Sequence, residues 1–119
     1  MKDIITARKS IAFAIKVVNT YKILISERKE YVLSKQFLRS GTAVGALIRE
    51  AEHAESKADF LHKMSIALKE ANETEYCLLL LKEGKFLNEQ EYKELAEESM
   101  ELVRLLASIV KTTKANLKR

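Results

Sequence analysis

Apolar residues at heptad spacing dominate residues 33–81 and limit this stretch to a helical structure. One seam alternates between intervals of four and three residues, which keeps its side chains on one helix face; its members are Phe60, Met64, Ala67, Ala71, Thr74, Leu78 and Leu81. A matching stripe upstream consists of Phe37, Gly41, Val44, Ile48 and Ala51. Between the two, Ser56 and Asp59 have the spacing of a capping box, in which the serine accepts a hydrogen bond from a free amide of the first turn. We therefore predict a helical hairpin with its turn near residue 57.

Heptad patterns also mark both ends of the chain. The N-terminal seam, which we expect to face the bundle, is formed by Ile4, Ala7, Ile11, Ala14, Val18, Tyr21 and Ile25. We expect Gly84 to end the third helix in the left-handed conformation, and Asn88, with Glu91 three residues later, to open the fourth. The last seam consists of Tyr92, Leu95, Ser99, Leu102, Leu106, Ile109 and Thr113. We predict an all-α single domain over residues 1–119, an antiparallel up-and-down four-helix bundle with helices near 3–27, 30–55, 58–83 and 88–117.

The composition agrees with long helices in a reducing compartment. The chain of 119 residues has no proline, three glycines and one cysteine. Lack of proline favours uninterrupted helices, and a single cysteine excludes an intrachain disulfide. The first residues lack the apolar core of a signal peptide, and no stretch approaches the roughly 20 apolar residues of a membrane span. These features predict a cytoplasmic protein without a membrane segment.

Several apolar residues lie outside the main seams. They are Ile5, Ile23, Leu47, Leu61, Leu68, Leu79 and Leu105. Because a monomeric bundle needs only one apolar stripe per helix, the surplus predicts a second buried face and self-association; scattered exposed leucines are the alternative. Gly41 and Gly45 lie within one predicted helix, where each costs about 1 kcal/mol relative to alanine. We expect them to form a small-residue patch that another helix approaches, from the same subunit or a neighbour, with a simple kink as the alternative.

The residues that support catalysis or metal binding are sparse. Glu50 and His53 form a Glu-x-x-His pair, and Asp59 and His62 an acidic variant of it. A di-iron site needs two such motifs in mid-bundle and a core glutamate from each other helix, whereas these pairs flank a turn and the first helix has no acid between residues 3 and 27. We expect no buried metal centre and no cofactor, although a surface metal site stays open. Cys77 is expected to pack as a small apolar residue, so we predict that the chain is not an enzyme.

Two ion pairs are predicted from the antiparallel arrangement. With the second turn near residue 57, Arg39 lies level with Glu75, which shares a flank with Leu68 and is expected to need a cation. Similar counting about residue 29 places Glu50 level with Arg8. We interpret both pairs as structural contacts, within or between subunits, that set specificity.

Basic residues provide the functional hint that lies in the residues themselves. In an up-and-down bundle the start of the first helix and the end of the last share a pole, which would gather Arg8, Lys9, Lys111, Lys114, Lys118 and Arg119. Copies of the chain would repeat this pole, so that weak phosphate contacts add. The alternative is a solvated pole whose charges complement the helix dipoles.

Three stretches resemble a known family. Residues 33–46 (LSKQFLRSGTAVGA), 56–71 (SKADFLHKMSIALKEA) and 73–76 (ETEY) are similar to the signature of the four-helix-bundle proteins encoded in intervening sequences of bacterial 23S ribosomal RNA. The resemblance implies an up-and-down bundle, usually assembled as a ring-shaped homopentamer, with no established enzymatic activity. Related bundles are accessory proteins to the reverse transcriptase of diversity-generating retroelements, where they engage RNA and the polymerase. Leu47 and Cys77 depart from the pattern, which commonly has Asn and Trp there.

Two functions follow as expectations. The first is a non-enzymatic, oligomeric scaffold that binds RNA or another nucleic acid through the basic pole. The second is a protein-interaction adaptor, for example an accessory subunit to a reverse transcriptase.

Overall fold

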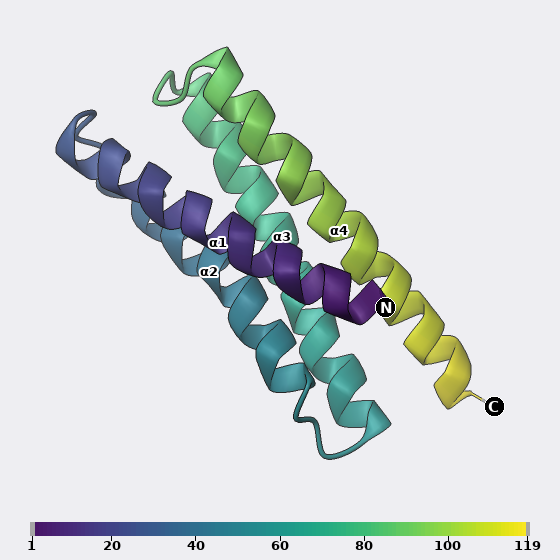
Figure 1. Ribbon diagram of the computed structural model, residues 1–119. Helices are drawn as coiled ribbons and strands as arrows, with labels where there is room; N and C mark the ends of the chain where they lie inside the picture. The colour runs from purple at the N-terminus through teal and green to yellow at the C-terminus, as the bar shows by residue number, and fades with distance from the viewer. Residues whose placement is uncertain (1, 119) are drawn as a thin grey trace.

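Four helices form an elongated up-and-down bundle. The computed structural model describes residues 2–118 and contains α1 (Lys2–Ser26), α2 (Leu33–Ala51), α3 (Lys57–Glu83) and α4 (Glu89–Leu117), with no strand among these residues (Figure 1). Each helix packs on its neighbours in the order α1, α2, α3, α4 and back to α1, while the backbones of the diagonal pairs lie farther apart, with no described Cα atoms within 8 Å. The described part measures 51 × 21 × 21 Å. The predicted all-α four-helix fold is therefore confirmed.

The seams predicted for α2, α3 and α4 form the core. Phe37, Val44, Ile48 and Ala51 of α2 are buried. The buried residues of α3 include Met64, Ala67, Ala71, Thr74, Leu78 and Leu81, and those of α4 include Leu95, Ser99, Leu102, Leu106 and Ile109. Heptad spacing thus identified the inward faces of these three helices correctly, because in each of them the predicted seam is the most apolar stripe that can be buried on both neighbours.

The seam predicted for α1 does not face the core. The residues that α1 buries are Thr6, Ser10, Phe13, Val17 and Leu24, at intervals of four, three, four and seven residues, which also fit a heptad pattern. Ile4 and Ile11 of the predicted seam are instead about half exposed. The prediction was wrong because α1 has two heptad stripes, and the more apolar one lies outside the protomer's core.

Helix α2 is shorter than predicted at both ends. It begins at Leu33, because the buried carboxylate of Glu30 accepts hydrogen bonds from the backbone amides of Val32 (3.2 Å), Leu33 (3.0 Å) and Ser34 (2.6 Å). A side chain that lies before the helix thus satisfies its first free amides, as an N-cap does. At the other end α2 stops at Ala51. The predicted range of 30–55 overlooked this cap, because glutamate is a good helix former and its propensity favours a longer helix.

The turns around α3 follow the predicted capping with one correction. Ser56 accepts a hydrogen bond from the Asp59 amide (3.0 Å), and Asn88 and Glu91 form a full capping box. Gly84, however, has a right-handed φ of −78°, and the left-handed residue is Lys85, with φ 66°. The prediction for Gly84 was therefore wrong by one position. The helix ends in a Schellman motif, in which the amide of Phe86 donates to the carbonyl of Leu81 and the amide of Lys85 donates to the carbonyl of Lys82. In this motif the residue after the C-cap, here Lys85, takes the left-handed conformation.

Ser99 is the one buried hydroxyl among residues 2–118 without a hydrogen-bond partner, and it is 1% exposed. Replacing Ser99 by Ala is expected to stabilise the fold by about 1 kcal/mol, because the variant no longer buries an unpaired polar atom. Urea denaturation measures the effect. Ser40→Ala is the matched control: Ser40 is equally buried, but its Oγ accepts a hydrogen bond from Thr74 Oγ1 (2.9 Å), so this variant should be destabilised. A loss of stability in Ser99→Ala would contradict the assignment.

Candidate functional site

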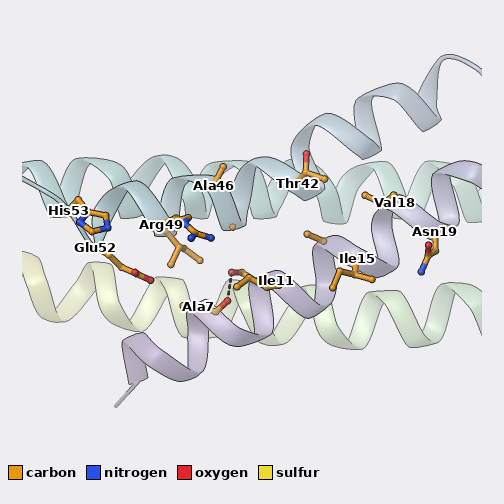
Figure 2. Close-up of a pocket in the computed structure, with 14 residues that line it drawn as sticks. Ala7, Ile11, Ile15, Val18, Asn19, Thr42, Ala46, Arg49, Glu52 and His53 are labelled. Atoms are coloured by element: carbon orange, nitrogen blue, oxygen red, sulfur yellow. Dashed lines mark hydrogen bonds between the residues drawn. The ribbon is translucent and has the colours of Figure 1, made fainter.

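The apolar stripe of α1 that does not face the core lines a groove of about 640 Å³ between α1 and α2 (Figure 2). We call it the α1–α2 groove. Its lining residues are Ala7, Ser10, Ile11, Ala14, Ile15, Val18 and Asn19 of α1, Thr42, Gly45, Ala46, Ile48 and Arg49 of α2, and Glu52 and His53 of the turn after α2. Ile11 is 53% exposed and Ile15 57% exposed. Over roughly three helical turns the groove presents bare aliphatic side chains at the spacing that a further helix would cover.

Two glycines of α2 bring the helices on either side of the groove together. A Cβ atom on Gly41 would lie 2.8 Å from Cγ2 of Val17, and one on Gly45 would lie 3.4 Å from Oγ of Ser10. The helix that approaches the small-residue patch is therefore α1 of the same chain. This close approach places the inner stripe of α1 against α2 and leaves the isoleucines at the outer edge.

Charged side chains lie at one end of the groove. Figure 2 shows Arg49 of α2 together there with Glu52 and His53 of the following turn, beyond Ala46. All three are exposed, and Arg49 has no ion pair within the described part of the chain. The groove therefore combines an apolar floor with a charged end at which the Arg49 guanidinium has no ion pair among the described residues.

The residues predicted to form a second buried face divide into two groups. Ile5 and Leu79 are exposed at 47% and 42%; the half-buried members are Ile23, Leu47, Leu61, Leu68 and Leu105. A single protomer thus leaves apolar surface on more than one helix. Self-association stays a prediction, and the α1–α2 groove adds a larger apolar surface than the sequence indicated.

Arg39 does not pair with Glu75. Its guanidinium donates to both carboxylate oxygens of Glu70 (3.1 Å each) and also contacts Glu73. This hydrogen bonding lowers the pKa of Glu70 below its usual range. The hydrogen bond between Thr74 and Ser40 shows that Arg39 and Glu75, the next residues along each helix, lie at the same height in the bundle, as predicted. Their side chains, however, point to different faces, so the predicted pair does not form.

Glu75 lies on the α4 side of α3. Lys82, seven residues later and so on the same helix face, packs its ammonium over the ring of Tyr92 in α4. Glu75 is half-buried, and no ion pair within residues 2–118 involves it. The cation that the sequence analysis expected for this carboxylate is therefore not supplied by the protomer.

Glu50 and Arg8 do not meet either. Glu50 pairs with Lys63 of α3 at 3.2 Å, because its side chain lies on the α3 side of α2 rather than the α1 side. Arg8 is exposed and forms no ion pair among the described residues. Counting residues from a turn predicts the level of a side chain, whereas its face depends on the rotation of each helix.

The predicted basic pole is only partly basic. Figure 1 shows the start of α1 and the last turns of α4 in the same half of the bundle. Lys9 is neutralised by Glu101 of α4 at 3.0 Å, whereas Lys111, Lys114 and Lys118 are exposed and have no ion pair in the described part. Arg119 lies outside the described residues. We call residues 111–118 the α4 basic segment; no acid follows Glu101 in the sequence.

The residues considered for metal binding or catalysis are dispersed. His53 and His62 are exposed on either side of the α2–α3 turn, and among residues 2–118 no three His, Cys, Asp or Glu side chains form a cluster that could hold a metal ion. Cys77 is buried, and burial raises the pKa of its thiol. No helix in the described part combines the length and apolar composition of a membrane span.

These features define the class of the protein: an all-helical up-and-down bundle with an apolar groove outside and a basic segment at the end of its last helix. Residues 2–108 match the family of 23S rRNA-intervening sequence proteins, and the chain belongs to that family, as the resemblance in its sequence indicated. The α4 basic segment follows the matched region.

One solved relative has the same fold over nearly its whole length. The crystal structure of a protein with unknown function from the S23 ribosomal protein family of Bacteroides thetaiotaomicron VPI-5482 is 53% identical to this chain. The match covers 93% of this chain and 99% of the relative, with a TM-score of 0.91. Among curated proteins, no sequence matches this chain.

Proposed function

We propose that this protein is a non-enzymatic cytoplasmic scaffold that associates with copies of itself, in a ring of five as its family resemblance implies, and contacts RNA phosphates through the α4 basic segment. The observation that supports RNA contact most directly is the exposure of Lys111, Lys114 and Lys118 in a part of the chain without acids. Intervals of three and four residues place these lysines on one helix face. They can therefore follow one stretch of phosphate backbone together.

Contact through this segment is sequence-independent. Lysine ammonium groups bind phosphates as point charges and release counterions from the nucleic acid. The last aromatic residue of the chain is Tyr92 near the start of α4, so no ring accompanies the lysines to stack on bases. Each lysine contributes weakly, and self-association would multiply the contacts without new chemistry.

Binding of a fluorescein-labelled stem-loop RNA to the full chain tests this proposal. The triple charge reversal Lys111→Glu, Lys114→Glu and Lys118→Glu is expected to weaken binding at least tenfold, on the order expected for three lost phosphate contacts. The slope of log K against log salt should become shallower by about 3, roughly one for each lysine. Fluorescence anisotropy between 50 and 200 mM salt, a range in which phosphate contacts change strongly, measures both effects.

A matched variant carries the same charge change elsewhere. Lys22, Lys35 and Lys93 are exposed lysines on three different helices, and their triple reversal to Glu should leave much more of the RNA affinity. Equal losses in the two variants would show that only net charge matters. Unchanged affinity in the first variant would contradict the proposal.

A protein-interaction adaptor is the second candidate, and the α1–α2 groove supports it. An exposed apolar groove binds amphipathic helices, as in other helix-in-groove complexes. A partner held there, for example a reverse transcriptase as the resemblance implies, would remain bound at high salt. RNA held by the α4 basic segment would be released under the same conditions.

A further inference from the structure

Two helices of this bundle have one heptad stripe more than the core uses. In α1 the extra stripe lines the α1–α2 groove. In α3 the buried seam is accompanied by a second stripe at intervals of four and three residues; we call it the outer α3 stripe, and it comprises Leu61, Ser65, Leu68, Asn72, Glu75 and Leu79. A heptad stripe is the pattern by which one helix packs along another. Leu61 and Leu68 pack partly at the edge of the core, but each extra stripe leaves apolar side chains that are still exposed, Ile11 and Ile15 in α1 and Leu79 in α3.

We propose that the α1–α2 groove of one copy receives the outer α3 stripe of the next copy. The proposal rests on the self-association stated above and names the two surfaces that would carry it. Helices α1 and α3 are diagonal in the bundle, and their described backbones do not approach within 8 Å between Cα atoms. The two stripes therefore belong to different sides of the protomer, so both can be engaged at once in a head-to-tail contact.

Charge complementarity supports this pairing. Glu75 in the outer α3 stripe is half-buried, and Arg49 lies beside Glu52 at one end of the groove; neither Glu75 nor Arg49 forms an ion pair within residues 2–118. A carboxylate in an apolar surface is costly unless a charge partner reaches it. Placing Glu75 of one copy against Arg49 of the next neutralises both groups while the leucines cover Ile11 and Ile15.

A two-fold contact of the groove with itself is less well matched. Antiparallel α1 helices would place Arg49 of one copy against the end of the groove formed by Asn19 and Thr42 in the other. That end has no acid among its lining residues. The two-fold contact would also leave Glu75 without a cation. The head-to-tail contact satisfies both charges, and it is the contact that forms closed rings or filaments.

Mixing two single variants tests the proposal. Ile11→Glu damages the groove and Leu79→Arg damages the outer α3 stripe, and each side chain is sufficiently exposed to be replaced without disturbing the core. Light scattering should find the wild type larger than its monomer mass of 13.6 kDa and each variant monomeric. A 1:1 mixture should form a dimer and nothing larger, because only the intact groove of one variant and the intact stripe of the other can pair.

Ile5→Glu is the matched control, since Ile5 is 47% exposed on the same helix but does not line the groove. It should assemble like the wild type, and thermal melts of all variants establish that they fold. A charge swap gives an independent readout: Arg49→Glu and Glu75→Arg should each raise the dissociation constant at least about tenfold, and the double variant should recover most of the loss.

The outcomes separate this inference from the proposed function. A monomeric wild type overturns self-association and, with it, the interface. An oligomeric wild type whose assembly survives both Ile11→Glu and Leu79→Arg overturns only the interface. Monomeric Ile11→Glu beside fully assembled Leu79→Arg overturns the head-to-tail contact in favour of a two-fold one at the groove.

Discussion

Replacing Gly41 by Leu is expected to destabilise the bundle by about 3 kcal/mol, the upper part of the range for overpacked cores. Even a single Cβ atom at this position would lie 2.8 and 2.9 Å from the two methyl carbons of Val17. Val17 is fully buried and β-branched, so its side chain cannot rotate away. Helices α1 and α2 would have to separate along the floor of the α1–α2 groove, and urea denaturation of wild type and variant measures the loss.

The alanine variants of the two glycines provide the matched comparison. Gly45→Ala should be neutral or stabilising by up to about 1 kcal/mol, because alanine is the better helix former and its Cβ would meet Ser10 at ordinary contact distance. Gly41→Ala has the same propensity gain but also the clash with Val17, so it should be the less stable of the two. Val17→Ala combined with Gly41→Leu should recover part of the loss. A Gly41→Leu variant as stable as the wild type would contradict close packing of α1 on α2.

Most of the fold could be predicted because in three helices one heptad stripe is clearly more apolar than any other. The seam that includes Met64 and Leu78, and the caps at Ser56 and Asn88, lie where sequence spacing placed them. Helix α1 could not be assigned in this way, since both of its stripes have heptad spacing. The decision between them depends on the fit of Val17 against Gly41, which involves two segments far apart in the sequence.

The candidate surfaces were predictable only in part. The lysines of the α4 basic segment are exposed as helical spacing suggests, but the neutralisation of Lys9 depends on which residue of α4 lies opposite. The α1–α2 groove was missed because its isoleucines were assigned to the core. One signal in the sequence indicates it: the inner stripe with Phe13, Val17 and Leu24 is a second heptad set, and two sets on one helix mean that one of them faces outward.

Replacing Glu30 by Ala is expected to cost about 2 to 3 kcal/mol, since charge-assisted hydrogen bonds contribute about 1.5 to 3 kcal/mol and a buried amide would lose its acceptor. The Glu30 carboxylate accepts from three backbone amides at the start of α2, and the last of these, the amide of Ser34, belongs to a fully buried residue. Ser34 also donates its hydroxyl to the Glu30 carbonyl at 2.6 Å. Without the carboxylate the first turn of α2 should fray, and the loss of helical circular dichroism during thermal unfolding measures the change in stability.

The pH dependence of this loss identifies the charged carboxylate as its source. Burial acts to raise the pKa of Glu30, but the backbone amides of Ser34, Leu33 and Val32 more than offset it, so the pKa lies below its usual value. A carboxylate with a lowered folded-state pKa stabilises the fold above the unfolded-state pKa of about 4.3 and loses that contribution as the pH falls through its folded-state pKa. The difference between wild type and Glu30→Ala should therefore be largest near neutral pH and shrink in acid. Glu30→Gln, which retains an amide oxygen without the charge, should lie between the two at neutral pH. A difference that does not change with pH would mean that packing, rather than the ionised cap, holds α2 at Leu33.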